Sequence, residues 1–412
     1  MIKKILNYLK NNSLYRNSIY LITGTFLMSG FGFFFWMINA RLFTPEQIGL
    51  ATTIISVMGT ITSFSLLGLN ISLIRYLPKS KRKSDMINTC FSSVALTTIT
   101  ISTFFLINIR TFSSKLLFIK ENQFYAFFFI FFMVFSSSSA LIESIFISFK
   151  NSKFVFIKNT IFSILKLIFP FFLITLGAYG IFSSWMIALM VGFGISFFLL
   201  KTKFNYQPKL VFHISIVRDI GKYSFGNYIV GFIGDLPIML LPVMILNRLN
   251  AETAAYYYMA MMVANVLFII PRAVSSTLFA EGSNNEKGIK GHVKKAIKII
   301  SLLLIPGILI TFFFGKYILL MFGNEYSEEG FKFLQLLAFS GILVAVNSVF
   351  TTLFRVRNKV KELIFISFIG TLSILWLSYL LLDKGLIGVG LAWIIGQGII
   401  GVFYLGLVKR KV

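Results

Sequence analysis

Residues 124–148 read FYAFFFIFFMVFSSSSALIESIFIS, and Glu143 is the only charged residue among them. A helix needs about 20 predominantly apolar residues to cross the hydrocarbon core of a bilayer, so this stretch predicts a membrane-spanning helix. The whole chain has the same character. Of its 412 residues, 57% are hydrophobic and 13% are charged, and the mean hydropathy is +0.85. Soluble domains carry roughly a quarter charged residues. We therefore predict a polytopic membrane protein.

Twelve stretches are long and apolar enough to span a membrane, which predicts an all-α fold of twelve transmembrane helices. No connection between them exceeds about 22 residues, so the sequence predicts no sizeable domain outside the membrane. The expected spans are 17–39, 47–72, 87–109, 124–148, 155–176, 181–200, 223–246, 253–279, 296–314, 331–354, 363–382 and 386–407.

The distribution of Lys and Arg predicts the orientation. If both termini are cytoplasmic, the inner segments hold 29 of the 39 Lys and Arg residues and the outer loops hold 8. An excess of Lys and Arg marks cytoplasmic loops, whereas acids contribute little to the rule. We therefore expect both termini on the cytoplasmic side of the inner membrane. The same distribution explains the formal charge of +25 without nucleic acid as a partner.

The two halves of the chain resemble each other at an offset of 208 residues. Gly177 falls on Gly385, Gly180 on Gly388, and Trp185 on Trp393. Because each half contains six spans, the halves have the same orientation and form parallel repeats. We predict an N-lobe at 1–200, a cytoplasmic linker at 201–222 and a C-lobe at 223–412. Such chains place the substrate between the lobes and rock one against the other.

Four ionisable residues fall within expected spans: Glu143, Lys166, Asp235 and Arg272. Such residues are costly in hydrocarbon and are functional candidates by default. Arg272 and Lys166 would bind an anionic head group, because a guanidinium offers paired donors to a phosphate. Asp235 and Glu143 would couple transport to H⁺ or Na⁺. The alternative interpretation is that the four residues pair with one another and only hold helices together.

Uncharged polar side chains would complete the substrate site, because amides recognise sugar hydroxyls. The candidates are Asn39, Asn265 and Asn347, although amides also join helices within membranes. One cysteine excludes an intramolecular disulfide, and two histidines leave little material for a metal site. We expect no catalytic residue, no metal and no cofactor other than a coupling ion.

Three stretches carry a family resemblance. Residues 40–49 (ARLFTPEQIG) resemble the A-R-x-L-x-P-E-x-x-G signature of polysaccharide flippases, which belong to the multidrug/oligosaccharidyl-lipid/polysaccharide superfamily. Residues 270–283 (IPRAVSSTLFAEGS) are similar to that family's I-P-x-A-V-S-x-x-L-F-x-E-x-S stretch, and residues 319–326 (LLMFGNEY) to its L-x-x-F-G-x-x-Y outer loop. The family's basic residue inside the first span is missing here, since Arg41 lies at the end of that span.

This resemblance implies a V-shaped pair of six-helix bundles like that of the multidrug exporters called MATE transporters. It implies alternating access, which moves a polyprenyl-diphosphate-linked oligosaccharide from the inner to the outer leaflet of the cytoplasmic membrane. The partners it implies are the lipid-linked glycan, membrane lipid, and glycan-polymerising and assembly proteins. Cationic cavity residues would receive the diphosphate.

Other functions fit parts of the same sequence. A cation-coupled multidrug exporter of the same superfamily would favour acidic cavities, whereas the acids and bases within the spans are equal in number. A glycan polymerase or ligase would need a large outer loop with catalytic side chains, and the outer loops here reach only about 16 residues. A non-transporting component of glycan assembly is the remaining alternative.

Overall fold

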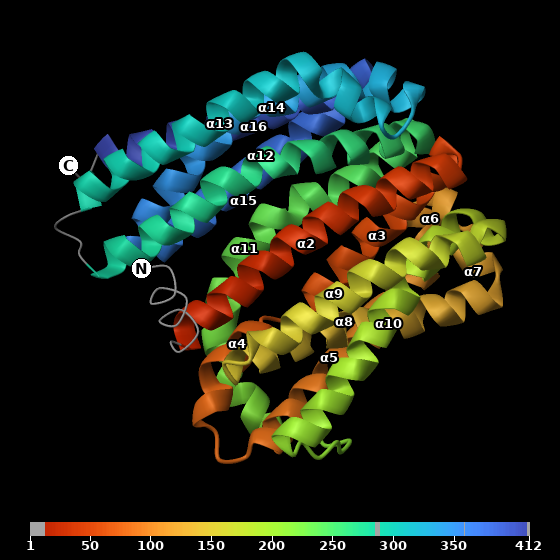
Figure 1. Ribbon diagram of the computed structural model, residues 1–412, viewed down its shortest axis with the longest axis vertical. Helices are drawn as coiled ribbons and strands as arrows, with labels where there is room; N and C mark the ends of the chain where they lie inside the picture. Colours follow the sequence, from red (N-terminus) through yellow and green to blue (C-terminus); the bar gives the residue numbers. More distant parts are fainter. Residues whose placement is uncertain (1–12, 285–288, 358, 410–412) are drawn as a thin grey trace, which may run out of the picture. The chain divides into compact units, whose positions relative to one another are not determined.

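The structure is a computed structural model that describes residues 13–284, 289–357 and 359–409, and all regular secondary structure in these ranges is helical (Figure 1). Within these ranges twelve helices have at least 17 residues, and each expected span corresponds to one of them. The all-α architecture of a multi-pass membrane protein is therefore confirmed. Both termini lie outside the described residues. The long helices are α2 (Ser13–Leu42), α3 (Pro45–Leu66), α5 (Lys83–Ile107), α8 (Gln123–Ser148), α9 (Ser152–Ile168), α10 (Gly177–Phe204), α11 (Ile214–Arg248), α12 (Ala251–Asn284), α13 (Ile289–Leu320), α14 (Asn324–Val356), α15 (Val360–Leu381) and α16 (Gly385–Lys409).

Ten helical stretches among the described residues meet the length and hydropathy required to cross a membrane, and one of them, residues 360–407, contains both α15 and α16. Short helices connect the long ones. They are α4 (Leu69–Tyr76), η1 (Leu77–Lys79), α6 (Ile109–Phe112), η2 (Ser114–Leu116), α7 (Phe118–Glu121), η3 (Phe169–Phe172), η4 (Ile174–Leu176) and η6 (Leu382–Lys384).

Two expected spans are less regular than their apolar sequence suggests. The second is interrupted between α3 and α4, where Leu67 and Gly68 have positive φ angles of 48° and 75°. The fifth leaves the α-helical conformation after Ile168 and continues as the 3₁₀ helices η3 and η4. Pro170 explains this change, because proline removes a backbone donor and clashes with the preceding turn. Hydropathy alone does not detect either break.

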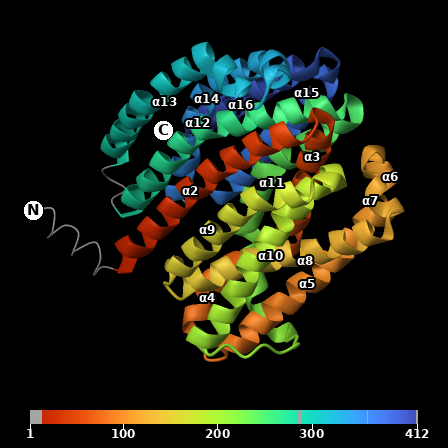
Figure 2. The same ribbon diagram turned by 45° about the vertical axis from the view of Figure 1, so that its right-hand side comes forward.

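The chain divides into two compact units, here called the first unit (Met1–Phe43 and Ile54–Tyr228) and the second unit (Thr44–Thr53 and Ile229–Val412). In the first unit, α8 packs against α5 and α10, and α9 packs against α2 and α10. In the second, α14 packs against α12, α13 and α16, while α15 packs on α16 (Figures 1 and 2).

The turn before α3 explains the signature at residues 40–49. Thr44 and Gln47 form a capping box, in which the Gln47 amide N–H donates to Thr44 Oγ1 (3.3 Å) and the Thr44 N–H donates to Gln47 Oε1 (3.2 Å). Pro45 fills the first helical position, where no donor is needed. A Cβ added to Gly49 would overlap the carbonyl oxygen of Ala251. Glycine there lets α3 approach the start of α12 within the second unit.

The repeated glycines begin α10 and α16 in the same way. Gly177 and Gly385 have φ angles of 55° and 63°, and each follows a short 3₁₀ helix. A Cβ added to Gly180 would overlap the carbonyl oxygen of Leu173, and one added to Gly388 would overlap that of Leu381. The same backbone geometry therefore recurs 208 residues later, as expected for repeats.

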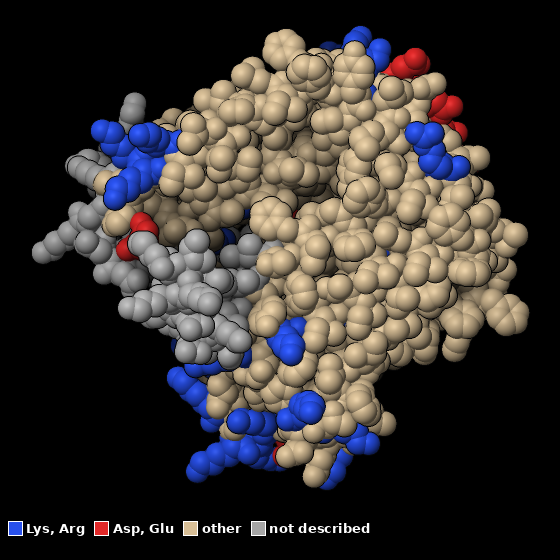
Figure 3. Space-filling model, viewed as in Figure 1, with Lys and Arg blue, Asp and Glu red and all other residues tan. Residues whose placement is uncertain are grey.

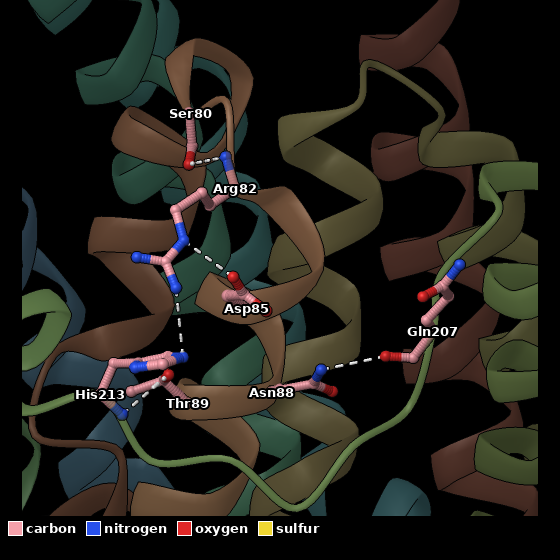
Figure 4. A network of polar contacts seen from close by, with 7 residues as sticks. All are labelled: Ser80, Arg82, Asp85, Asn88, Thr89, Gln207 and His213. Atoms are coloured by element: carbon pink, nitrogen blue, oxygen red, sulfur yellow. Dashed lines mark hydrogen bonds and ion pairs between the residues drawn. The ribbon is translucent and has the colours of Figure 1, made fainter.

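The segment between α10 and α11 is bound to α5 of the first unit (Figure 4). Tyr206 donates its hydroxyl hydrogen to Asn88 Oδ1, which also accepts from the Lys209 N–H at 3.2 Å. Asn88 Nδ2 donates to the Gln207 carbonyl at 3.0 Å. Burial raises the pKa of Tyr206 to about 12, so its hydroxyl stays protonated and remains a donor at neutral pH. One amide thus holds three residues of the connecting segment.

A second set of contacts holds the end of this segment (Figure 4). The Arg82 Nε donates to Asp85 Oδ2 at 2.8 Å, and its Nη2 lies 3.3 Å from His213 Nε2. The His213 N–H donates to Thr89 Oγ1 at 3.3 Å. The connection is therefore bound to α5 from residue 206 to residue 213.

Candidate functional site

A polar cavity of about 480 Å³ lies within the second unit, among α11, α12, α14, α15 and α16. Its wall combines two arginines, ten side chains with a hydroxyl or an amide, and seven largely apolar side chains. The lining residues are Gly234, Pro237, Arg272, Ser275, Ser276, Phe279, Val344, Asn347, Ser348, Thr351, Thr352, Arg355, Ile366, Ser367, Thr371, Ile374, Trp393, Gln397, Ile400 and Tyr404.

The charge of this second-unit cavity is positive. Arg272 comes from α12 and Arg355 from α14, and none of the lining residues is acidic. Asp235 in α11 lies close enough to Arg272 to interact electrostatically. Among the described residues, however, neither arginine forms an ion pair with a carboxylate. Both guanidinium groups therefore keep their donors for a ligand.

The polar wall is only partly satisfied by internal hydrogen bonds. Asn347 Nδ2 donates to the carbonyl oxygen and to the Oε1 of Gln397, both at 2.9 Å. The hydroxyls of Thr351 and Tyr404 lie 2.8 Å apart. Three buried lining atoms have no hydrogen-bond partner among the described residues: Ser275 Oγ, Asn347 Oδ1 and Trp393 Nε1. Buried polar atoms are normally paired, so these atoms favour a polar occupant.

A second cavity, of about 220 Å³, lies within the first unit. An ion pair dominates it. Lys158 Nζ lies 2.6 Å from Glu143 Oε1 and donates to Ser139 Oγ at 2.7 Å. The lysine side chain is 7% exposed and that of the glutamate 34%. The lining residues are Met28, Thr62, Ser136, Ser139, Ala140, Glu143, Lys158, Asn159, Phe162, Trp185 and Leu189. This first-unit cavity is therefore close to neutral.

Lys166 occupies an aromatic cage beside the first-unit cavity. Its Nζ lies 4.8 Å from the ring centre of Trp185, 5.0 Å from that of Phe162 and 5.7 Å from that of Phe35. Aromatic faces attract cations at about these distances. The side chain is 2% exposed, and the described residues offer its ammonium no carboxylate or hydrogen-bond acceptor. Lys166 contacts two rings of the cavity wall but does not line the cavity.

The two cavities occupy equivalent places in the predicted repeat. At the offset of 208, eight of the eleven described lining residues of the first-unit cavity fall on residues that line the second. Two of the pairs explain the difference in charge between the cavities. Glu143 is equivalent to Thr351 and Lys158 to Ile366, so both members of the first-unit ion pair are uncharged residues in the second unit. The equivalent pairs are Ser136 and Val344, Ser139 and Asn347, Ala140 and Ser348, Glu143 and Thr351, Lys158 and Ile366, Asn159 and Ser367, Trp185 and Trp393, and Leu189 and Gln397.

The structure brings together some of the predicted site residues. Arg272 and Asn347 line one cavity, while Glu143 lines the other. Asn39 is buried in α2 and donates from Nδ2 to the Phe35 carbonyl at 2.7 Å. Asn265 is half-buried in α12 and lines neither cavity.

Sequence reasoning missed two charged residues of these cavities. Arg355 and Lys158 were both expected in inner segments, at the ends of apolar stretches. Helical spacing could have identified them, because residues four positions apart share a helix face. Arg355 follows Asn347 and Thr351 at steps of four, and Lys158 precedes Phe162 and Lys166 at the same steps.

Comparisons with known proteins agree with this architecture. The sequence profile of the family described as "Polysaccharide biosynthesis protein" matches residues 14–279, and the MatE profile matches residues 229–380. No curated protein matches the chain significantly.

Solved structures show the same fold at low sequence identity. An inward-facing multidrug resistance MATE family transporter of the MOP superfamily is 15% identical, with a TM-score of 0.74 over 93% of this chain and 94% of that one. The lipid II flippase MurJ, in an inward closed conformation, is 18% identical, with a TM-score of 0.74 over 95% and 87%. A MOP superfamily transporter from Pyrococcus furiosus is 13% identical, with a TM-score of 0.64 over 97% and 95%. This multi-pass membrane protein therefore belongs to the polysaccharide biosynthesis protein family and has the fold of the MOP superfamily transporters.

Proposed function

We propose that this protein is a flippase for a polyprenyl-diphosphate-linked oligosaccharide, which it moves from the inner to the outer leaflet of the cytoplasmic membrane by alternating access. The observation that carries the proposal is the second-unit cavity, where Arg272 and Arg355 face a polar space without a lining carboxylate. Planar guanidinium groups bind phosphate oxygens through paired, charge-assisted hydrogen bonds. The diphosphate is the anion that this cavity would receive.

The uncharged polar side chains of the second-unit cavity could bind the sugar that is attached to the diphosphate. Asn347 Oδ1 and Ser275 Oγ are buried without a partner, and Trp393 Nε1 is a free donor among the described residues. Sugar hydroxyls both donate and accept, so they could satisfy all three atoms. Lys166 remains a candidate for binding the anion within the first unit, where its ammonium is caged by aromatic rings.

A multidrug exporter of the same superfamily is the alternative within transport. A cavity for organic cations would favour carboxylates, and the second-unit cavity has none among its lining residues. In the first-unit cavity, Glu143 is already neutralised by Lys158 at 2.6 Å. The charge distribution therefore favours an anionic substrate. A transport role without a catalytic residue follows from the same proposal.

The orientation and energy source complete the proposal. The excess of Lys and Arg in alternate connections supports cytoplasmic termini in the inner membrane. Asp235 is exposed in α11 beside Gly234, which lines the second-unit cavity. Because the carboxylate interacts with Arg272 without forming an ion pair, its protonation or occupation by Na⁺ would change the field at the arginine. We assign the coupling role to Asp235, with Glu143 as a second coupling residue.

Reconstituted translocation tests the proposal. Proteoliposomes would contain a fluorescent undecaprenyl-diphosphate oligosaccharide, and its appearance in the opposite leaflet would be measured by quenching. A hydrogen bond to a charged group contributes about 1.5–3 kcal/mol, so Arg272→Ala or Arg355→Ala should weaken substrate binding roughly tenfold to a hundredfold. Arg272→Lys should retain part of the affinity, because it keeps the charge but loses the paired donors.

Lys361→Ala is the matched control, since this exposed lysine lies in the first turn of α15, another helix of the cavity wall, and does not line the cavity. It should translocate the substrate at the wild-type rate. Wild-type translocation by the Arg272→Ala/Arg355→Ala double variant would refute the proposed site.

A further inference from the structure

An apolar groove separate from both polar cavities lies between α13 and α14 of the second unit. It encloses about 310 Å³, and Ser301 is the only polar residue among the thirteen that line it. The lining residues are Val293, Ile297, Ile300, Ser301, Leu304, Ile305, Ile308, Ile342, Ala345, Val346, Val349, Phe350 and Leu353. Several of them are open to the surroundings, including Ile297 and Ile305, which are 50% and 52% exposed.

The groove is long and narrow. Along α13 it extends from Val293 to Ile308, a distance of roughly 22 Å at 1.5 Å per residue. One leaflet of the hydrocarbon core is only about 15 Å thick. The groove is therefore longer than one leaflet is deep, and a single chain that fills it from one end must extend past the bilayer midplane, which favours a polyprenyl chain.

One end of the groove is basic. On α13, Lys294 and Lys298 lie three residues before Ile297 and Ser301, so each borders a lining residue on the helix surface. Both lysines are exposed, and neither forms an ion pair with a described residue. Leu353 lines the same end from α14 and is followed by exposed Arg357.

The other end of the groove is apolar, since Ile308 and Ile342 close it and the nearest residues on both helices are uncharged. Figure 3 shows the same contrast on one face: Lys and Arg side chains gather where α13 begins, and the surface over the rest of that helix is almost free of charge. A ligand would therefore have an anionic head and a long apolar tail. Because anionic lipid head groups attract Lys and Arg at membrane surfaces, the charge pattern matches such a lipid.

We propose that this groove binds the polyprenyl chain of a phosphorylated carrier lipid, with the phosphate held by Lys294 and Lys298. The inference rests on the proposed function, because it gives the hydrocarbon tail of the same substrate a site of its own. The groove would hold the substrate in a docked state that precedes entry. In that state the diphosphate lies at Lys294 and Lys298, and it passes to Arg272 and Arg355 in the second-unit cavity in a later step, while the chain stays outside that cavity. Ordinary phospholipids and the uncharged prenol are the competing occupants.

Photo-crosslinking tests the groove without requiring transport. Purified full-length protein in phosphatidylcholine nanodiscs would receive one of three diazirine probes: undecaprenyl phosphate, phosphatidic acid or neutral undecaprenol. Labelled peptides would be located by mass spectrometry. We expect undecaprenyl phosphate to label peptides from α13 and α14 more strongly than either other probe.

Two kinds of variant separate the contributions of tail and head group. Val346→Trp fills the groove from an exposed position and should lower labelling by undecaprenyl phosphate roughly tenfold, and Ile305→Trp should do the same if the first variant folds poorly. Leu302→Trp is the control, because Leu302 is 70% exposed on α13 outside the groove. The double variant Lys294→Gln/Lys298→Gln should lower labelling by undecaprenyl phosphate roughly tenfold and leave labelling by undecaprenol unchanged. The control double variant Lys201→Gln/Lys203→Gln on α10 should leave labelling by both probes unchanged.

Equal labelling of the Val346→Trp, Ile305→Trp and Leu302→Trp variants would overturn the groove as the site. Labelling by phosphatidic acid as strong as that by undecaprenyl phosphate would overturn the polyprenyl assignment, and equal labelling by undecaprenol would overturn the role of the lysines. The proposed function can fail independently. If the Arg272→Ala/Arg355→Ala variant translocates normally while the groove is still labelled, only the head-group site is refuted.

Discussion

The ion pair in the first-unit cavity allows a double-mutant cycle that the protein's own repeat defines. Glu143 and Lys158 are equivalent to Thr351 and Ile366 in the second unit. The perturbations are therefore Glu143→Thr, Lys158→Ile and the double variant. The double variant has at both positions the uncharged residues that the second unit carries there.

The structure sets the expected magnitudes. Glu143→Thr leaves an ammonium that is 7% exposed with Ser139 as its remaining described acceptor. Removing one partner of a buried pair costs about 3–5 kcal/mol. Because the glutamate is 34% exposed, solvent screening places the cost at about 3 kcal/mol or slightly less. Lys158→Ile frees a carboxylate that solvent can reach, which should cost about 1–2 kcal/mol.

The double variant should lose no more than about 1 kcal/mol, because replacing both members of a buried pair by uncharged residues is often neutral. The resulting coupling energy is about 3 kcal/mol. Unfolding in mixed micelles of increasing dodecyl sulfate fraction, followed by tryptophan fluorescence, would measure all four proteins. Lys153→Ile is the control, because Lys153 is exposed on the same helix.

The reasoning would be refuted if the losses in the two single variants simply added in the double variant. A coupling energy below about 1 kcal/mol would be typical of an exposed pair, and it would show that water reaches Lys158.

Two further outcomes concern the backbone and the connecting segment. Gly388→Ala should abolish the yield of monodisperse protein, because the added Cβ overlaps the carbonyl oxygen of Leu381. Gly398→Ala is the control and should leave the yield unchanged, since an added Cβ there meets nothing within 4 Å. Equal yields of the two variants would contradict the close approach at Gly388. Tyr206→Phe removes the hydroxyl that donates to Asn88 and should lower stability by about 1 kcal/mol at neutral pH. Because burial raises the pKa of Tyr206 to about 12 from an ordinary value of 10.0, the folded wild type is progressively destabilised as the pH rises from 10 toward 12. The stability advantage of wild type over the variant should therefore shrink above pH 10, and a constant difference would be the contrary result.

The helices could be predicted from the sequence because hydrophobic length is a direct physical requirement of the bilayer. Glu143 in the stretch at 124–148 did not obscure the span, since one ionisable residue among many apolar ones is tolerated when it has a partner. The break at Leu67 and Gly68 was missed because φ angles leave no mark on hydropathy.

Of the two arginines that line the second-unit cavity, only one was predicted from the sequence. Arg272 lies well inside an apolar stretch and was therefore a candidate, whereas Arg355 lies at the end of one and resembles an ordinary cytoplasmic flank. Both line the same cavity. Lys158 was also counted as a flank, although α9 begins six residues before it, at Ser152. Whether a charged residue at the end of a span lines a cavity depends on how the helices pack. The hydropathy of a single span contains no information on that packing.

The repeated tryptophan gives the protein a built-in pair of optical reporters. Trp185 lies beside the first-unit cavity, with the Lys166 ammonium 4.8 Å from its ring centre, and its counterpart Trp393 lines the second-unit cavity. Indole emission shifts with the local electric field and with hydration. Since the chain has only two other tryptophans, Trp36 and Trp376, replacing three of the four by phenylalanine would leave a single emitter at either cavity. Occupancy of each cavity could then be followed separately in an otherwise unlabelled protein.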